Sequence, residues 1–456
     1  MDNSTPQQHR YWALTTVGLG TFMSALDGSI VNTVLPLLRE ELNTTVAGIE
    51  WVTTVYLLVV SGLLLGFGRA GDLYGQKRVY LSGFILFAIG SALCGLANSV
   101  HSLITLRGVQ AVGAAMLFSS SPAILTKAFP ASERGRALGA QATMTYLGLT
   151  VGPALGGWLA HVLGWRWIFY INIPVGLVAI LLAWRTITDD RPRAKPEPFD
   201  ISGAIIFLAG FVALLIALNQ GHAWGWHSAL TLTVFGVATA LLVAFVQIER
   251  RSRSPMLDLS LFRNPIFSST TLSAFLNYIC VYSVVFVIPF LLVQGRGLDT
   301  RQAGLILTAQ PLVMAITAPI SGELSDRIGT RGLAMLGMAL LSIGLIYLGV
   351  AAANDSLRTM VAALAVFGLG IGIFVSPNNS ALMGAAPRER QGIAAGVLAT
   401  ARNVGMVCGV GISGAIFTTY LEAGGTNALT RGTQMSLYVG AAIAFVGIFT
   451  SAVRDR

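Results

Sequence analysis

Charged residues are scarce in this chain. Asp, Glu, Lys and Arg make up 11% of its 456 residues, whereas they make up about 25% of a typical soluble protein. Hydrophobic residues account for 54%, and the mean hydropathy is +0.71. This composition excludes an ordinary soluble domain and predicts an all-α polytopic membrane protein.

Cysteines and catalytic motifs are also rare. The three cysteines, Cys94, Cys280 and Cys408, are scattered through apolar segments, so we expect neither a disulfide framework nor a metal site. The chain has no Walker loop and no HExxH, GxSxG or CxxC motif. ATP-driven pumping and hydrolytic catalysis therefore have no support, and we expect no cofactor and no enzyme activity.

The net charge of +9 does not indicate a nucleic-acid partner. Its Lys and Arg residues lie in short segments between apolar stretches. A nucleic-acid-binding protein would instead carry a basic stripe with interleaved aromatics on a soluble domain. The bilayer is the expected partner, and we expect a monomer.

The apolar stretches predict fourteen transmembrane spans. Each is long enough to cross about 30 Å of hydrocarbon. The predicted spans are 11–38, 48–68, 79–97, 102–128, 135–160, 166–184, 201–220, 227–248, 267–294, 302–323, 332–352, 357–386, 391–421 and 433–452.

The distribution of basic residues predicts the orientation. With the N-terminus inside, 21 of the 29 Lys and Arg residues fall in cytoplasmic segments and only six fall outside. Cytoplasmic loops carry the excess of positive charge in membrane proteins. We therefore expect a multi-pass protein of the bacterial cytoplasmic membrane with both termini in the cytoplasm.

Two polar linkers divide the chain. They cover Thr186–Phe199 and Glu249–Asn264, and two predicted spans lie between them. Residues 1–186 are therefore predicted to form an N-terminal six-helix bundle, and 265–456 a C-terminal one. Residues 187–264 would hold cytoplasmic linkers and two extra transmembrane helices.

Asp27 is the only carboxylate deep inside an apolar segment. A charge at that depth costs about 2.5–3.5 kcal/mol and is kept mainly where it has a function. Burial favours the protonated form of a carboxyl group, so Asp27 is the predicted proton carrier. The structural alternative is an acid bonded to the backbone or to hydroxyls such as Ser24 or Ser29.

A short motif occurs once in each predicted bundle and indicates an internal repeat. The first copy contains Gly68, Asp72, Gly75 and Arg78; the second contains Gly322, Asp326, Gly329 and Arg331. Both copies are predicted to lie in cytoplasmic loops. Repeated halves around a central site are typical of transporters.

Several motifs in order resemble those of the major facilitator superfamily, specifically its fourteen-helix drug:proton antiporter branch. The resemblance covers nearly the whole chain. The motifs are Leu26–Pro36, Trp51–Leu58, Gly68–Arg78, Arg107–Gly113, Gly148–Gly157 and Trp165–Pro174. Glu50 departs from the pattern, which usually has glutamine there, and it adds a second candidate acid for proton coupling.

The resemblance implies roles for two of these motifs. The loop motif is expected to clamp the opposite half at the cytoplasmic side, with Asp72 near Arg390 and Asp326 near Gly135. The fifth-helix motif is expected to restrict proton leak. Its small residues also allow close helix packing, and its proline can kink the helix; its members are Gly148, Gly152, Pro153, Gly156 and Gly157.

Polar residues inside other spans predict a central cavity. Arg107 and Gln110 lie one turn apart on one helix face, although Arg107 could instead extend to the outer interface. Arg402, next to Asn403, could line the cavity, pair with a carboxylate or cap backbone carbonyls. Further candidates are the polar residues Asn32, Gln141, Gln310 and Asn378 and the aromatic residues Tyr56, Phe118, Tyr146 and Phe286.

These features predict a proton-coupled antiporter that exports lipophilic compounds by alternating access. Aromatic faces attract cations, so cationic drugs are the expected substrates. An exporter of a lipid, a siderophore or an endogenous metabolite is the alternative within the same class. A membrane-embedded enzyme or receptor without transport is the alternative from a different class.

Overall fold

A computed structural model of the chain describes residues 6–130, 133–188, 201–225, 227–251, 259–354, 356–387, 391–425 and 427–453. These residues form long helices and two short helical turns. The N-terminal helices are α1 (Pro6–Glu41), α2 (Val46–Tyr74), α3 (Gln76–Gly95), α4 (Val100–Ala128), α5 (Arg134–Val162), α6 (Trp167–Tyr170), α7 (Asn172–Thr186), α8 (Ile201–Trp224) and α9 (Ala229–Arg251). The C-terminal elements are η1 (Leu259–Arg263), α10 (Pro265–Phe290), η2 (Leu291–Gly295), α11 (Thr300–Leu307), α12 (Ala309–Ile328), α13 (Thr330–Ala353), α14 (Leu357–Ala385), α15 (Gln391–Ala423) and α16 (Ala428–Ala452).

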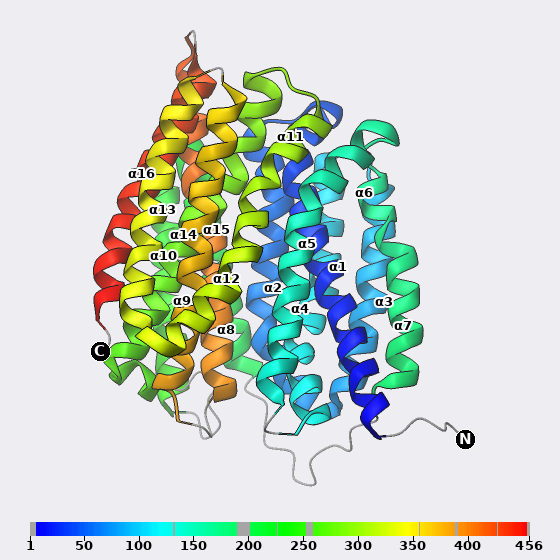
Figure 1. Cartoon of the computed structure of the whole chain (residues 1–456). Helices are drawn as coiled ribbons and strands as arrows, with labels where there is room; N and C mark the ends of the chain where they lie inside the picture. The colour runs from blue at the N-terminus through cyan, green and yellow to red at the C-terminus, as the bar shows by residue number, and fades with distance from the viewer. Residues whose placement is uncertain are drawn as a thin grey trace.

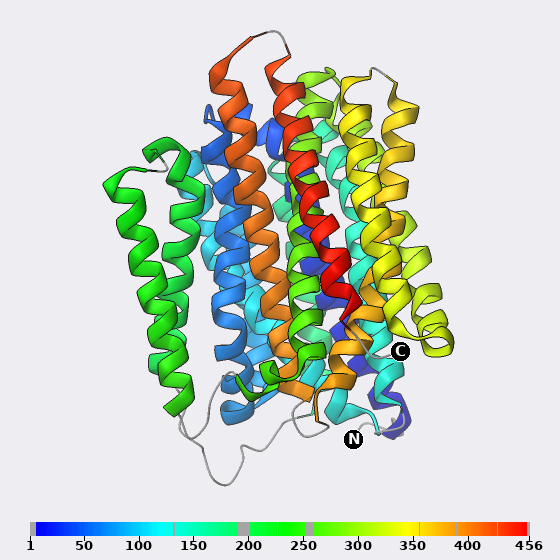
Figure 2. The same ribbon diagram turned by 90° about the vertical axis from the view of Figure 1, so that its left-hand side faces the viewer.

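The long helices run side by side along one common direction (Figure 1). Both chain ends lie at the same end of the bundle in both views (Figure 2). We call this the terminal end and the opposite one the far end. The connection between α1 and α2 lies at the far end, and that between α2 and α3 lies at the terminal end.

The same helix-packing scheme occurs twice. In the N-terminal half α1 packs against α5, α2 and α3 pack against α4, and α3 packs against α7. In the C-terminal half α10 packs against α15, α12 and α13 pack against α14, and α13 packs against α16. Contacts between the halves follow the same correspondence: α2 meets α15, the counterpart of α5, and α5 meets α11 and α12, and α12 is the counterpart of α2.

Helices α8 and α9 form a pair at the side of the bundle (Figure 2). The ring centre of Phe207 in α8 lies 5.0 Å from that of Phe245 in α9 and joins the two helices, while the Phe207 ring also stacks on Phe211 of its own helix. Helix α8 packs against both α2 and α15, and Leu208 fills the space over Gly62. The pair therefore lies over the seam between the two halves.

The prediction of fourteen spans is not supported. Within the described residues, twelve helices are long and apolar enough to cross a membrane. The predicted spans 135–160 and 201–220 are missing from this set. The first lies in α5, where glycine, threonine and proline lower the hydropathy. In α8 the apolar stretch Ile205–Leu214 is the longest uninterrupted part whose side chains are described.

The sequence predicted that both copies of the duplicated motif lie in loops, and this prediction is wrong. Asp72 belongs to the last turns of α2 and Asp326 to those of α12. Each helix ends at a glycine with positive φ, Gly75 at 98° and Gly329 at 86°, and the next helix follows directly. Glycine ends helices this way because it adopts positive φ without strain.

The clamp that the resemblance implies involves residues that are not fully described. Arg390 lies outside the described residues. The backbones of Asp72, Asp326 and Gly135 are placed in their helices. The clamp stays a prediction.

The two halves are in contact at the far end. Arg39 of α1 donates to Gln294 Oε1 of η2 at 2.6 Å, and Gln294 Nε2 donates to Glu40 at 3.3 Å. Below them, α5 and α11 approach so closely that a Cβ on Gly157 would collide with the Thr300 carbonyl, and one on Gly304 with the Pro153 carbonyl. One buried apolar cluster includes Leu38 and other side chains from both halves there.

We expect Gly157→Val to push α5 and α11 apart and open the far end. Spin labels at Glu41 and Arg358, which are exposed at the far ends of α1 and α14, should move apart in a distance measurement. Gly236→Val is the matched control, because a Cβ there meets nothing within 4 Å. An unchanged distance distribution in a folded Gly157→Val protein would contradict a close contact that holds this end shut.

Candidate functional site

Asp27 lies at the centre of a buried polar cluster. Arg107 Nη1 of α4 donates to Asp27 Oδ2 at 2.7 Å. Gln110 Nε2 and Asn172 Nδ2 donate to Asp27 Oδ1 at 3.0 and 2.8 Å. Each of the four side chains is at most 1% exposed, so one carboxylate accepts three hydrogen bonds and pairs with one cation.

A second set of contacts orients these donors. Arg107 Nη1 also donates to Gln110 Oε1 at 2.7 Å, which turns the Gln110 amide group toward Asp27. Asn172 Nδ2 also donates to Ser91 Oγ at 3.0 Å, and Ser91 donates to the Phe169 carbonyl at 2.8 Å. The cluster therefore connects α1, α3, α4 and the start of α7.

Local backbone features place two of the donors. Gly90 of α3 lies against the backbone of Gln110, where a Cβ would come within 2.7 Å of the Gln110 Cα, so α3 and α4 pack closely at this level. Asn172 is the first residue of α7, after a break at Ile171. Pro174 lies in the first turn of α7, where a missing N–H is tolerated.

Arg107 also contacts aromatic rings. Its guanidinium carbon lies 4.2 Å from the centre of the Tyr56 ring and 5.8 Å from that of Phe169. Cation–π contacts stabilise a buried guanidinium. Arg107 does not reach outward to the membrane interface, because Asp27 and these rings hold it inside.

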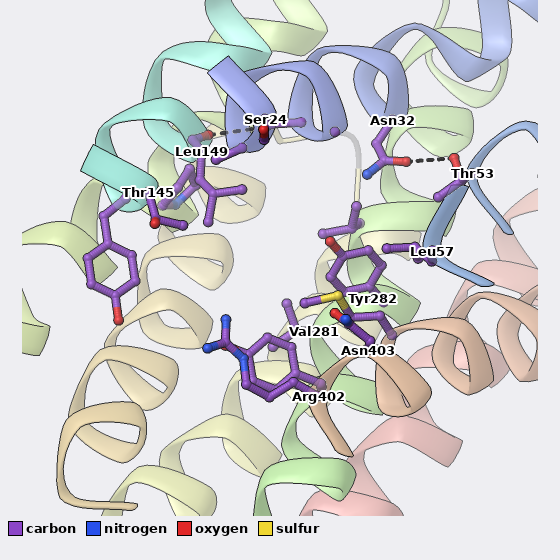
Figure 3. A pocket seen from close by; sticks show the side chains of 18 of the residues that line it. Ser24, Asn32, Thr53, Leu57, Thr145, Leu149, Val281, Tyr282, Arg402 and Asn403 are labelled. Atoms are coloured by element: carbon purple, nitrogen blue, oxygen red, sulfur yellow. Dashed lines mark hydrogen bonds between the residues drawn. The ribbon is translucent and has the colours of Figure 1, made fainter. Parts of the chain in front are cut away.

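A cavity of about 420 Å³ lies between the two halves. It is lined by residues of α1, α2, α4 and α5 on one side and of α10, α12, α14 and α15 on the other. Figure 3 shows Ser24 and Thr145 across this space from Tyr282 and Arg402, with Arg402 extending into it. Its size is within the range of small-molecule sites.

Most of the predicted cavity residues do line this space. They are Asn32, Tyr56, Arg107, Phe118, Gln141, Tyr146, Gln310, Arg402 and Asn403. Asn32 also accepts a hydrogen bond from Thr53 Oγ1 at 2.8 Å. They come from both halves, so the cavity is shared.

Three predicted cavity residues, and Glu50, the second candidate for proton coupling, lie elsewhere. Gln110 belongs to the Asp27 cluster, and Phe286 is buried against Phe290. Asn378 donates to the Thr270 carbonyl at 3.2 Å and so joins α14 to α10. Glu50 is 2% exposed and packs against Gly414 of α15, at the contact between the halves.

The charged residues of the described lining are two arginines, both of them predicted cavity residues. Arg107 and Arg402 are the only charged side chains among the described residues that line the cavity, and none of these residues is acidic. Asp27 is fully buried and is not part of the lining. Arg402 has no carboxylate partner among the described residues; its guanidinium carbon lies 4.7 Å from the centre of the Tyr278 ring.

Sequence reasoning did not single out three residues of the site. Asn172 was noted only as part of a motif, although an amide inside an apolar stretch is itself a signal of a buried polar contact. Tyr278 and Tyr282 line the cavity from α10. They are four residues apart in an apolar helix, and this spacing places both rings on one face.

The serines suggested as partners of Asp27 bond elsewhere. Ser24 Oγ donates to the Gly20 carbonyl, and Ser29 Oγ donates to the Leu149 carbonyl of α5.

The glycines of the fifth-helix motif explain why α5 can pack so close to α1. A Cβ on Gly148 would lie 2.6 Å from the Phe22 carbonyl of α1.

We expect Arg107→Leu to destabilise the protein strongly, because it leaves the Asp27 carboxylate buried without its cation. Loss of one partner of a buried ion pair costs about 3–5 kcal/mol. The double variant Asp27→Leu/Arg107→Leu should recover most of the loss, since an apolar replacement of the whole pair is nearly neutral. Thermal unfolding in detergent measures this, with the exposed Arg358→Leu as control; a double variant as unstable as the sum of the two single variants would rule out the pairing.

Comparisons with known proteins agree with this architecture. The family model of the Major Facilitator Superfamily matches residues 17–264 and 270–455. A riboflavin transporter, RibZ of Clostridioides difficile, is 33% identical over 97% of this chain and 96% of its own length. The multidrug resistance protein Stp of Mycobacterium tuberculosis is 34% identical over 90% of this chain and 76% of its own length.

A solved structure shares the fold. A bacterial homologue of the human lysosomal transporter Spinster superposes with a TM-score of 0.70 at 15% identity, over 98% of this chain and 96% of that one. Relatives named as multidrug resistance proteins agree with the drug:proton antiporter branch that the motifs indicate. The family and its transporter-named members indicate transport rather than catalysis. The chain belongs to the Major Facilitator Superfamily.

Proposed function

We propose that this protein exports lipophilic organic compounds in exchange for protons, by alternating access. The observation that carries the proposal is the buried Asp27–Arg107 pair, which adjoins a cavity shared by both halves. Intramembrane ion pairs of this kind are typical of proton relays in transporters. The relatives named as multidrug resistance proteins support drugs or toxic compounds as substrates.

The hydrogen-bond pattern suggests how a proton would act. A proton on Asp27 Oδ2 removes the charge that holds Arg107 Nη1 at 2.7 Å. Arg107 would then keep only Gln110 Oε1 and the ring faces as partners. Because Arg107 lines the cavity and Asp27 does not, protonation of the buried acid would be transmitted to the cavity through the movement of Arg107.

The contacts at the far end suggest which state of the transport cycle the structure represents. The α5–α11 contact and the bonds of Gln294 close that end. We propose that the far end is extracellular and that the halves separate there when the site turns outward. Both termini would then face the cytoplasm of a bacterial cell, and α5 and α8 would cross the membrane with the other helices.

A second candidate function is the transport of an endogenous metabolite. RibZ, named as a riboflavin transporter, matches nearly the whole chain. A cavity lined by amides, hydroxyls and aromatic rings suits a polar ring system as well as a drug. Flux measurements with both classes of compound would decide between them.

We expect Asp27→Asn to abolish uphill export driven by a pH gradient. The amide keeps the size of the side chain but cannot carry the proton, whereas downhill exchange should survive. Flux in proteoliposomes with an imposed pH gradient measures both, and the exposed Glu41→Gln is the matched control. If Asp27→Asn still concentrates substrate with normal proton flow, another group carries the proton, and Glu50 is the first candidate.

We expect single cysteines at Arg78 and His101 to label from opposite sides of the membrane. Both side chains are exposed, beside the α2–α3 turn and at the start of α4. In intact cells, a membrane-impermeant maleimide should label His101→Cys only, because the terminal end faces inward. Cys94, Cys280 and Cys408 are replaced beforehand; labelling of Arg78→Cys from outside would reverse the proposed orientation.

A further inference from the structure

We propose that the cavity binds lipophilic anions, and that Arg402 is the side chain that takes the anionic group. This inference rests on the proposed transport function and narrows its substrate class. It starts from the charges around the cavity. Asp27 and Arg107 neutralise each other at 2.7 Å, so the positive charge of Arg402 is left uncompensated within the described lining.

Arg402 is available to a ligand. It is partly buried at mid-length of α15, and its only described contact is with the face of Tyr278. A contact with a ring face uses none of the guanidinium N–H groups as a hydrogen-bond donor to the ring edge, and no hydrogen bond of Arg402 occurs among the described residues. A planar guanidinium binds carboxylate, sulfonate or phosphate groups through two parallel hydrogen bonds.

The surroundings of Arg402 supply further donors. Asn403 is adjacent in sequence, and Gln310 faces the same cavity from α12. Tyr146 and Tyr282 line the same cavity. Amide N–H and phenol O–H groups can donate to the oxygens of an anion, while the apolar lining contacts its hydrocarbon part.

A lipophilic cation fits this cavity poorly. Two of the rings that would attract it already lie against arginines, since the guanidinium carbon of Arg107 is 4.2 Å from the centre of the Tyr56 ring and that of Arg402 is 4.7 Å from the centre of the Tyr278 ring. No acidic side chain among the described lining residues is available to balance it. A cation would also be repelled by Arg402 in a site of low dielectric constant, where charges interact strongly.

The test measures binding separately from transport. The probes are 1-pyrenesulfonate and (1-pyrenylmethyl)trimethylammonium, which share one ring system and carry fixed opposite charges. Fluorescence anisotropy is measured with the purified full-length protein in nanodiscs of uncharged lipid, against empty nanodiscs. The sulfonate should bind about tenfold or more tightly than the ammonium compound, as expected for one charged hydrogen-bonded contact.

Three variants test the assignment to Arg402. Arg402→Gln should lose most of the preference for the sulfonate, and Arg402→Lys should keep part of it because the charge remains. Arg358→Gln removes an equal charge from an exposed position at the start of α14 and should change nothing. Equal binding of both probes, or unchanged sulfonate binding in a folded Arg402→Gln protein, would overturn the proposal.

The ligand-class proposal and the transport proposal can fail independently, and the measurements show which of them has failed. If proteoliposomes show no proton-driven export while the purified protein still prefers the sulfonate through Arg402, the transport proposal fails and the ligand class stands. If export proceeds but the ammonium compound binds and is transported better, the ligand class is wrong and the transport proposal stands.

Discussion

The rest of the structure depends on keeping one ion pair inside an apolar helix bundle. Two isolated charges at this depth would each cost several kcal/mol, and the pair is stable only because its remaining hydrogen-bonding groups are largely satisfied. Asp27 has three donors, and Gln110 and Asn172 are held in place by Arg107 and Ser91. The Arg107 Nε atom is the exception, since it is buried without a partner and lies beside the Tyr56 ring face. These requirements fix the relative positions of α1, α3, α4 and α7, so the N-terminal half is rigid around the pair.

In the proposed transport cycle, the movement takes place between the halves rather than within the N-terminal half. Within the N-terminal half, α1 and α5 approach closely through Gly148, Gly152 and Gly156. Across the halves, contact is made by α2 with α15, by α5 with α11 through Gly157 and Gly304, and by a buried apolar cluster and polar side chains at the far end. Two rigid bodies joined by a limited contact surface can exchange between two arrangements with little internal repacking. The cavity lies at this surface, so in the proposed cycle its accessibility would change with the arrangement of the halves.

The sequence predicted the family and the helical architecture because long apolar stretches and ordered motifs are local signals. It also singled out Asp27 as an acid inside an apolar helix, and it predicted most of the residues that line the cavity. A polar residue in an apolar helix must face another polar group or a cavity. It did not predict the Asp27–Arg107 pair, because the two residues are 80 positions apart and their pairing depends on how α1 and α4 pack. The duplicated motif was predicted as loop because its charged residues resemble a linker, whereas the helices continue to Gly75 and Gly329 inside the motif and the next helices begin directly after these glycines. The expectation of a cationic substrate stays a prediction; it counted aromatic residues from the sequence, which does not show that arginines lie against the rings of Tyr56 and Tyr278.

An anionic substrate would change the energetics of the proposed exchange. One proton moving inward and one monovalent anion moving outward together carry two positive charges into the cell, whereas exchange of a proton for a cation carries none. At about 2.3 kcal/mol per charge per 100 mV, the membrane potential would add roughly 4.6 kcal/mol per 100 mV to such a cycle. The charges at the site, in contrast, oppose the exchange. A proton on Asp27 leaves Arg107 uncompensated and so strengthens the attraction of the site for an anion. Coulomb forces at the site therefore favour binding of proton and anion together. Exchange then requires that the doubly loaded protein does not switch between its two arrangements, and this restriction has to come from the contacts between the halves rather than from the charges in the cavity.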